Sequence, residues 1–346
     1  MTATVPVGVV LFPPPVHSVL DAITRAERAG IGTAWVPSWP IGPDGLSIVT
    51  AAAARTSSIG LASGIAITYP SHPLARANEA LVAAELAPGR FRLGIGASHK
   101  VRIEGQYGLP FGKPLTHLRE YIAVLRGILW DGHVDLEGEY YRVHAALPPM
   151  ITPPRPPIVL AALRKNMLRL AGEVSDGAML IFAGPSYIRS IARPALEEGA
   201  RLAQRPRPPL ITAASVMLTS DFAVVREAAQ AGFAHYSGLP TYGEMFREAG
   251  FPLTAQGRLS DELIHEVFVY GDEETIHRRL LALHEAGADE LAVTIRYCVI
   301  ARMGRSTSRR SPARRCWSSR SPRTRPSMPT SASSGNCMRE KAFRST

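Results

Sequence analysis

The chain has 346 residues, 46% of them hydrophobic and 20% charged, which is ordinary for a globular enzyme and, at this length, suits one large α/β-barrel domain. No apolar run approaches the roughly 20 residues of a membrane-spanning helix, and the proline-broken N-terminus lacks the basic start of a signal peptide, so we expect a cytoplasmic protein. The formal net charge of +10 comes from residues 301–346, which hold twelve Lys or Arg and one acidic residue, and the nearly neutral remainder argues against a nucleic-acid-binding body.

A repeated pattern runs along residues 1–295. A helical segment ends in a glycine-bearing turn and a short run of β-forming residues follows, as in "AERAGIGTAWV" and "HEAGADELAVTI". Because helices often end at glycine and short loops before apolar strands suit parallel sheets, the pattern predicts βα units. Eight such strands predict a (β/α)8 TIM barrel. The predicted strands are residues 7–12, 33–37, 59–68, 91–96, 158–161, 177–182, 210–218 and 290–295, and the predicted helices are residues 17–30, 46–57, 72–87, 115–132, 164–174 and 272–287.

Two intervals are too long for simple connections between these elements. Residues 132–157 contain "GHVDLEGEYYRV", which predicts a small hairpin, and residues 233–271 predict additional helices. Insertions of this kind on a barrel shape a substrate pocket, form an oligomer interface such as that of a homodimer, or only elaborate the surface.

The stretch "GIGASH", residues 94–99, raises the question of a nucleotide-binding loop. A dinucleotide fingerprint needs a third glycine and an immediately following helix, but Ala97, Ser98 and His99 follow Gly96 and we expect no helix before about residue 115. A phosphate-binding P-loop is excluded because no Gly-Lys-Ser/Thr follows. The stretch is instead interpreted as the fourth barrel strand and its exit, at the end where barrel active sites lie.

The C-terminal segment breaks the pattern. An eighth helix should follow residue 295, but residues 297–346 are rich in Arg, Ser and Pro without periodicity, so we expect a barrel domain over residues 1–296 and a disordered tail over 297–346. A reading-frame shift near residue 296 is one hypothesis for this change. The three cysteines, Cys298, Cys316 and Cys337, have neither zinc-site spacing nor a disulfide framework, so we expect no metal site.

Several segments together resemble the luciferase-like flavin-dependent superfamily, and in particular its oxidoreductases that use coenzyme F420. The resemblance covers roughly residues 5–295 in order, and it is carried by "RFRLGIGASH", "IGLASGIAITYPSHPLARAN", "REYIAVLRGILWDGHVDLEGEYYRV" and "PPIVLAALRKNMLRLAGEVSDGAML". It implies a barrel that holds F420, or alternatively FMN, at the carboxyl ends of its strands.

The resemblance also implies where the cofactor lies. Relatives often have a non-proline cis peptide in a bulge of the third strand behind the deazaflavin ring, which corresponds here to Gly64-Ile65. The strand exit at Gly96, Ala97 and Ser98 would form a wall of the same pocket. The phosphate would lie at "AALRKNM", through Ala162, Leu163, Arg164 and Lys165, where the long side chains either bind the anion or fill its space.

His99 is the candidate catalytic residue, because an imidazole suits proton transfer that accompanies hydride transfer. It aligns with the catalytic glutamate of a sugar-phosphate-oxidising relative, and a loop histidine that only forms a cap or a hydrogen bond is the alternative. In "WVPSWP", Ser38 and Trp39 are expected to line the substrate pocket, where that relative carries a histidine. For His72 we expect a role in starting a helix rather than in catalysis.

The sequence therefore predicts an F420-dependent oxidoreductase that transfers a hydride between F420 and a small organic substrate. Three alternatives stay open: an FMN-dependent monooxygenase of the same superfamily, a nucleic-acid-binding protein acting through its basic tail, and an inactive relative that lacks a barrel helix.

Overall fold

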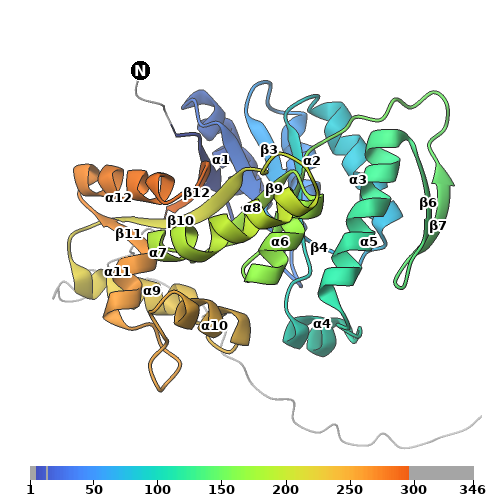
Figure 1. Ribbon diagram of the computed structural model, residues 1–346. Helices are drawn as coiled ribbons and strands as arrows, with labels where there is room; N and C mark the ends of the chain where they lie inside the picture. Colours follow the sequence, from blue (N-terminus) through green and yellow to red (C-terminus); the bar gives the residue numbers. More distant parts are fainter. Residues whose placement is uncertain (1–4, 13–14, 296–346) are drawn as a thin grey trace, which may run out of the picture. The chain divides into compact units, whose positions relative to one another are not determined.

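Eight parallel strands close into a barrel in the computed structural model, which describes residues 5–12 and 15–295 (Figure 1). The closing pair joins the first strand to the last, with Val7 opposite Leu291. The (β/α)8 prediction is confirmed. In order around the barrel, the strands are β1 (Val7–Val10), β2 (Thr33–Val36), β3 (Gly60–Ser63) with β4 (Ala66–Ile67), β5 (Phe91–Gly96), β8 (Ile158–Ala161), β9 (Gly177–Ile181), β10 (Leu210–Leu218) and β12 (Glu290–Ile295).

Helices surround the strands, and all six predicted helices are present. A seventh element, α8, was missed because Pro194 interrupts its pattern, yet the helical stretch that begins with α7 and η2 continues through this proline, next to the π-helical turn. The outer elements are α1 (Val16–Arg28), α2 (Gly45–Ala53), α3 (Pro73–Leu86), α5 (Pro114–Arg126) continued by the π-helical turn η1 (Gly127–Asp131), α6 (Lys165–Val174), α7 (Pro185–Tyr187) with η2 (Ile188–Ala192), α8 (Arg193–Leu202) and α12 (Glu273–Glu285).

The hydrophobic core has two parts. One lies between the strands and the helices, and the other fills the barrel interior around the fully buried Trp35. The indole of Trp35 donates to Glu290 Oε1 (3.1 Å), and the Arg92 guanidinium lies 4.5 Å from the Trp35 ring centroid while pairing with Glu290 at 2.7 Å. The side chains of Trp35, Arg92 and Glu290 therefore fill one end of the barrel interior.

The predicted third strand, residues 59–68, is interrupted between β3 and β4. The Gly64-Ile65 peptide bond at this point is cis, as the resemblance implies. Ser63 fastens the interruption to the next strand, since its hydroxyl donates to the Gly94 carbonyl (2.8 Å) and accepts from the Gly94 N–H (2.9 Å). A methyl group on Gly94 would overlap the Ser63 carbonyl, so only glycine allows the two strands to pass this closely.

Both insertions are present. The predicted hairpin consists of β6 (His133–Glu137) and β7 (Arg142–Ala146). Residues 233–271 supply α10 (Pro240–Glu248) and α11 (Asp261–Val267) after α9 (Phe222–Phe233), but they also supply a strand, β11 (Phe268–Gly271), which pairs with the end of β10. The expectation of no helix before residue 115 is wrong, because α4 (Lys100–Tyr107) follows β5 directly. Its single buried residue, Ile103, gives no apolar periodicity to detect.

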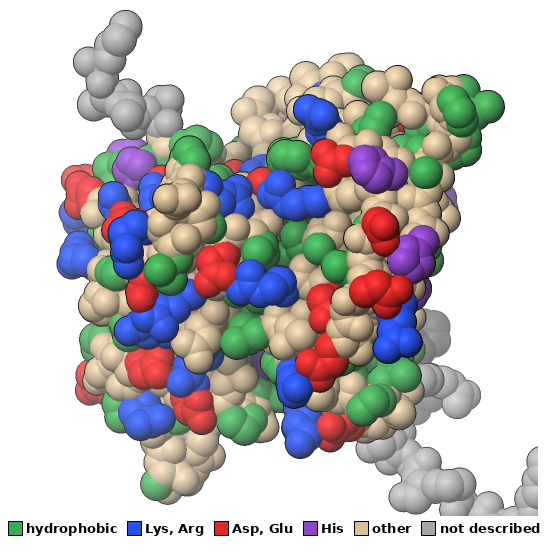
Figure 2. All heavy atoms as spheres, turned by 45° about the vertical axis from the view of Figure 1, so that its right-hand side comes forward, with side chains coloured by type: hydrophobic (Ala, Val, Ile, Leu, Met, Phe, Trp, Pro, Cys, Tyr) green, Lys and Arg blue, Asp and Glu red, His purple; other side chains and the backbone are tan. Residues whose placement is uncertain are grey.

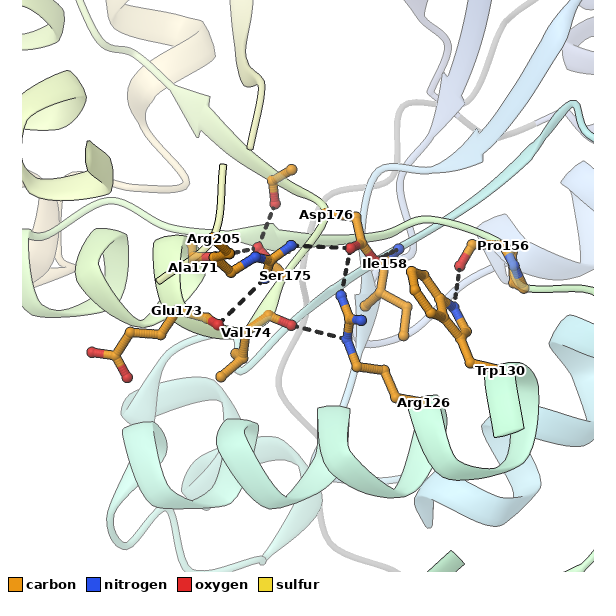
Figure 3. Close-up of polar contacts among 11 residues, drawn as sticks. Arg126, Trp130, Pro156, Ile158, Ala171, Glu173, Val174, Ser175, Asp176 and Arg205 are labelled. Atoms are coloured by element: carbon orange, nitrogen blue, oxygen red, sulfur yellow. Dashed lines mark hydrogen bonds and ion pairs between the residues drawn. The ribbon is translucent and has the colours of Figure 1, made fainter. Parts of the chain in front are cut away.

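Asp176 joins several elements at the amino ends of the strands (Figure 3). Its carboxylate pairs with Arg126 of α5 and with Arg205 (3.4 Å), and it accepts the backbone N–H of Ile158 at the start of β8 (3.0 Å). Arg126 also donates to the Val174 carbonyl at 3.1 Å. Since this joint is remote from the carboxyl ends of the strands, we assign it to stability.

The predicted tail, its cysteines, the suggested loss of the eighth helix and the domain boundary at residue 296 fall on or next to residues outside those described, so they stay predictions. Among the described residues, no helix is long and apolar enough to cross a membrane. On the face drawn in Figure 2, basic and acidic side chains alternate over the surface.

Candidate functional site

A cavity of about 430 Å³ opens at the carboxyl ends of the barrel strands. Its walls come from the loops after the strands, from α4, and from the segment that joins α9 to α10. Figure 1 shows α4 and α10 on the same side of the barrel, at its lower edge in this view. Most of the lining is apolar, with aromatic side chains at Phe12, Trp39, Phe111, Tyr236 and Tyr242.

Several small residues belong to the part of the lining that the strands form. Gly64, Gly96, Ala161 and Ala213 all line the cavity, as does Ile65. A methyl group on Gly96 would lie 3.0 Å from Ala161 Cβ and 3.0 Å from Ile65 Cδ1, tighter than ordinary contact. The floor is therefore shaped by the absence of side chains, which leaves room for a flat ring system.

The structure brings most of the predicted site residues together in this cavity. Ala162 and Lys165 are not part of its lining. Because side chains alternate along a strand, Ala162 points into the core between barrel and helices, while Lys165 begins α6 and is exposed. The predicted residues that line the cavity are Ser38, Trp39, Gly64, Ile65, Gly96, Ala97, Ser98, His99, Leu163 and Arg164.

His99 stands at the N-cap position of α4. Its backbone carbonyl accepts the N–H groups of Arg102 (2.9 Å) and Ile103 (3.0 Å), but its imidazole makes no cap hydrogen bond, and the ring centroid lies 5.5 Å from that of Tyr242. Burial lowers the pKa of His99 to about 4, and the positive charge of Arg102 acts in the same direction. At pH 7 the imidazole is neutral and faces the cavity.

His72 behaves differently, as predicted. Its Nδ1 accepts the N–H of Leu74 at 3.2 Å, so the ring caps the start of α3. It is absent from the cavity lining. The ring of His72 therefore caps a helix, whereas the ring of His99 makes no cap hydrogen bond.

Ser38 and Trp39 follow β2. The Ser38 hydroxyl donates to Asp44 Oδ1 (2.8 Å) and accepts the Gly45 N–H (3.0 Å), so both functions are used to begin α2. The Ser38 N–H donates to the Ile65 carbonyl at 3.2 Å and ties this loop to the cavity floor. The Trp39 indole N–H is buried and has no hydrogen-bond acceptor within the described part of the chain.

Arg164 is not a free cation. Its guanidinium pairs with Glu244 and with Glu248 (2.7 Å), both on α10, while its Nε is buried without a partner among residues 15–295. The pattern i, i+4 places both carboxylates on one face of α10. Sequence reasoning missed this pairing because α10 lies about 80 residues further along the chain.

Other cavity residues were also missed, notably Arg102 of α4 and Asn166 of α6, together with Tyr236, Thr241 and Tyr242 near α10. Asn166 could have been found from the sequence, because it lies in the first turn of a predicted helix that follows a barrel strand. Arg102 and the α10 residues gave no such signal, because α4 was not predicted and residues 233–271 were assigned only to additional helices.

A closed parallel barrel with a cavity at the carboxyl ends of its strands is the architecture of the (β/α)8-barrel enzymes, in which this end carries the active site. The chain belongs to the luciferase-like monooxygenase family, whose sequence pattern matches residues 2–290.

Individual relatives agree with this assignment. A Mycobacterium tuberculosis protein provisionally named a coenzyme F420-dependent oxidoreductase is 28% identical over 326 residues, with 82% of this chain and 91% of the relative covered. Two solved structures share the fold. The coenzyme F420-dependent tetrahydromethanopterin reductase of Methanopyrus kandleri has a TM-score of 0.68 and 24% identity, covering 84% of this chain and 93% of its own. The oxygenating constituent of 3,6-diketocamphane monooxygenase from Pseudomonas putida, in complex with FMN, has a TM-score of 0.65 and 19% identity, covering 84% and 92%. The family assignment makes the protein an oxidoreductase, and the relatives described here are named as F420-dependent or are bound to FMN.

Proposed function

We propose that the protein is an F420-dependent oxidoreductase that transfers a hydride between coenzyme F420 and an organic substrate. The observation that carries the proposal is the placement of a neutral, uncapped imidazole, His99, in the same cavity as Gly64 and Gly96 at the carboxyl ends of the strands. When bound, F420 gives or accepts the hydride at its C5 atom, and the protein supplies orientation and electrostatics.

The cavity residues fit such a cofactor. The floor around Gly64-Ile65 and the strand exit from Gly96 to Ser98 would hold the ring, and the turn from Leu163 to Arg164 would hold the phosphate at the N-terminus of α6. Two buried donors without acceptors in the described chain, Trp39 Nε1 and Arg164 Nε, belong to lining residues. Buried donors normally find acceptors, so these two favour an acceptor-rich ligand.

The neutral state of His99 narrows its role. An imidazole with a pKa near 4 carries no proton to donate at pH 7 and is also a weak base, but its free nitrogen can accept a hydrogen bond and orient a polar substrate group. A hydroxyl or amide group of the substrate could donate a hydrogen bond to this nitrogen, which would orient the substrate beside the bound cofactor. We therefore assign His99 the role of an orienting group that accepts a hydrogen bond.

Titration of the purified full-length protein with F420 and with FMN tests the proposal. We expect saturable F420 binding that raises the melting temperature and no comparable binding of FMN, since ligands that bind only the folded state stabilise it. Binding of FMN without binding of F420 would eliminate the proposal.

The FMN-dependent monooxygenase is the second candidate. It is supported by the shared fold of the Pseudomonas putida oxygenating constituent, which is in complex with FMN. Oxygen consumption by the protein loaded with reduced FMN would decide for it. Nucleic-acid binding and inactivity both depend on residues outside those described. DNA retention by a chain ending at residue 295 tests the first, and thermal melting of the full-length protein with and without F420 tests the second.

A further inference from the structure

Arg102 brings a positive charge to the cavity that no carboxylate of the described residues balances. Its side chain lines the cavity, and it forms no ion pair within residues 15–295. Its one described side-chain hydrogen bond runs from Nη2 to the backbone carbonyl of His235 (3.0 Å), which is a neutral acceptor. A guanidinium has five N–H donors, so this bond leaves donors for another partner.

The other charged groups of the cavity do not compensate Arg102. The lining contains no Asp or Glu among the described residues. The second arginine of the lining, Arg164, pairs with Glu244 and Glu248 on α10, so its charge is already matched. The neutral His99 adds no charge at pH 7. The side of the cavity next to α4 is therefore positive, while the one arginine on the side next to α6 already faces two carboxylates.

Arg102 is also held in place. Its guanidinium carbon lies 5.7 Å from the ring centroid of Tyr236, and the His235 carbonyl fixes one of its nitrogens. The His235 ring lies 6.3 Å from the ring of Trp39, whose buried indole N–H has no acceptor in the described chain. The Arg102 guanidinium, which lacks a counter-charge, and the Trp39 indole N–H, which lacks an acceptor in the described chain, thus both lie beside His235.

From these contacts we infer that the substrate of this enzyme carries a carboxylate, which Arg102 binds beside His99. The inference rests on the proposed function, because it names the substrate class of that same site. A guanidinium binds a carboxylate through two parallel N–H donors, so the pair fixes both position and orientation. The apolar and aromatic remainder of the lining suits an aromatic or aliphatic body. Arg102 is a specificity-determining residue in this assignment.

The same anion chemistry has a second source, since F420 carries a phosphate and carboxylates of its own. We assign Arg102 to the substrate because it lies next to His99, whose pKa its charge lowers, whereas the phosphate is expected at the N-terminus of α6. The two sources predict different effects of an Arg102 substitution on F420 affinity.

Calorimetric titration of the F420-loaded protein with paired probes tests the inference. The probes are benzoate against benzamide and hexanoate against hexanamide, each pair differing mainly in charge. The variants are R102Q, R102K and the control K100Q, which removes a charge from the same helix at an exposed residue outside the cavity lining. Melting temperatures confirm that each variant folds.

We expect wild type and K100Q to bind at least one carboxylate about tenfold or more tightly than its amide, the size of a charge-assisted hydrogen bond. R102Q should lose this preference and R102K should keep part of it, with F420 affinity unchanged in both. Absence of the preference in wild type, or its survival in R102Q, overturns the inference. A tenfold loss of F420 affinity in R102Q with an intact preference assigns Arg102 to the cofactor and also overturns it. If F420 does not bind at all, the proposed function fails, but the same titrations on the unloaded protein still measure the preference of Arg102.

Discussion

Replacement of Gly94 by alanine should destabilise the barrel and disturb the cavity floor together. The added methyl group would overlap the carbonyl oxygen of Ser63 and lie 3.1 Å from its carbonyl carbon, and both obstacles are backbone atoms that cannot rotate away. The strands must separate, which also lengthens the two hydrogen bonds between Ser63 and Gly94. Overpacking costs about 1–3 kcal/mol and each weakened bond up to about 1 kcal/mol, so we expect a loss of roughly 3–4 kcal/mol.

Urea unfolding followed by circular dichroism measures this loss, and the melting temperature should fall by about 5–10 °C. Gly105→Ala is the matched control. It makes the same substitution in α4, where the new methyl group would meet nothing within 4 Å and should stabilise the helix by up to about 1 kcal/mol. If Gly94→Ala unfolded within 1 kcal/mol of wild type, the close approach of Ser63 to Gly94 would not hold the floor in place.

Three further substitutions test the site and the joint at the other end of the barrel. Trp39→Phe removes a buried N–H that has no acceptor in the described chain. Thermal melting should therefore show unchanged or higher stability, while titration should show weaker cofactor binding. Lower stability with unchanged binding would contradict a role of the Trp39 N–H in holding the cofactor. Burial lowers the pKa values of His99 and His117 to about 4. Between pH 6.5 and 4 the unfolded chain therefore binds more protons than the folded chain, and the free energy of unfolding falls as the pH falls. The slope is up to about 1.4 kcal/mol per pH unit for each histidine. Urea unfolding at several pH values should give a flatter profile for His99→Gln, and an unchanged profile would refute the assignment. Asp176→Asn should cost about 1–3 kcal/mol because it leaves two arginines without their carboxylate, whereas Asp261→Asn, in an exposed pair, should cost clearly less. Equal losses of unfolding free energy would show that the contacts of Asp176 do not stabilise the barrel.

The barrel could be predicted from the sequence because its signals are local. The buried strands are short apolar runs, and the helices between them carry apolar faces that end at glycines, as Gly30 and Gly287 illustrate. The failures have equally local causes. Pro194 concealed α8, and the polar face of α4 left nothing periodic to detect.

The candidate site could be predicted only as far as the strand exits. Gly96, Ser98 and His99 follow a strand directly, so their place at one end of the barrel follows from the barrel itself. The partners that decide what these residues do come from elsewhere in the chain. Arg164 was predicted as a phosphate ligand from its place before α6, but its pairing with Glu248 depends on how α10 lies over the barrel, which no local pattern encodes.

The two ends of the barrel have different polar contacts, and this difference locates specificity. At the amino ends, Asp176 joins α5, β8 and the segment after α8 through several bonds at once, so a change there affects the whole barrel. At the cavity mouth, α4 and α10 are held by half-exposed arginine contacts, Arg102 to the His235 carbonyl and Arg164 to Glu248, and exposed pairs of this kind contribute little to stability. Exposed residues of α4 and α10 can therefore change with small losses of stability, whereas buried residues such as Ile103 and Phe246 cannot. Since the strand residues of the cavity lining are apolar or small and carry no charge, we expect the choice of a charged substrate to reside in the mouth, where Arg102 supplies the unbalanced charge.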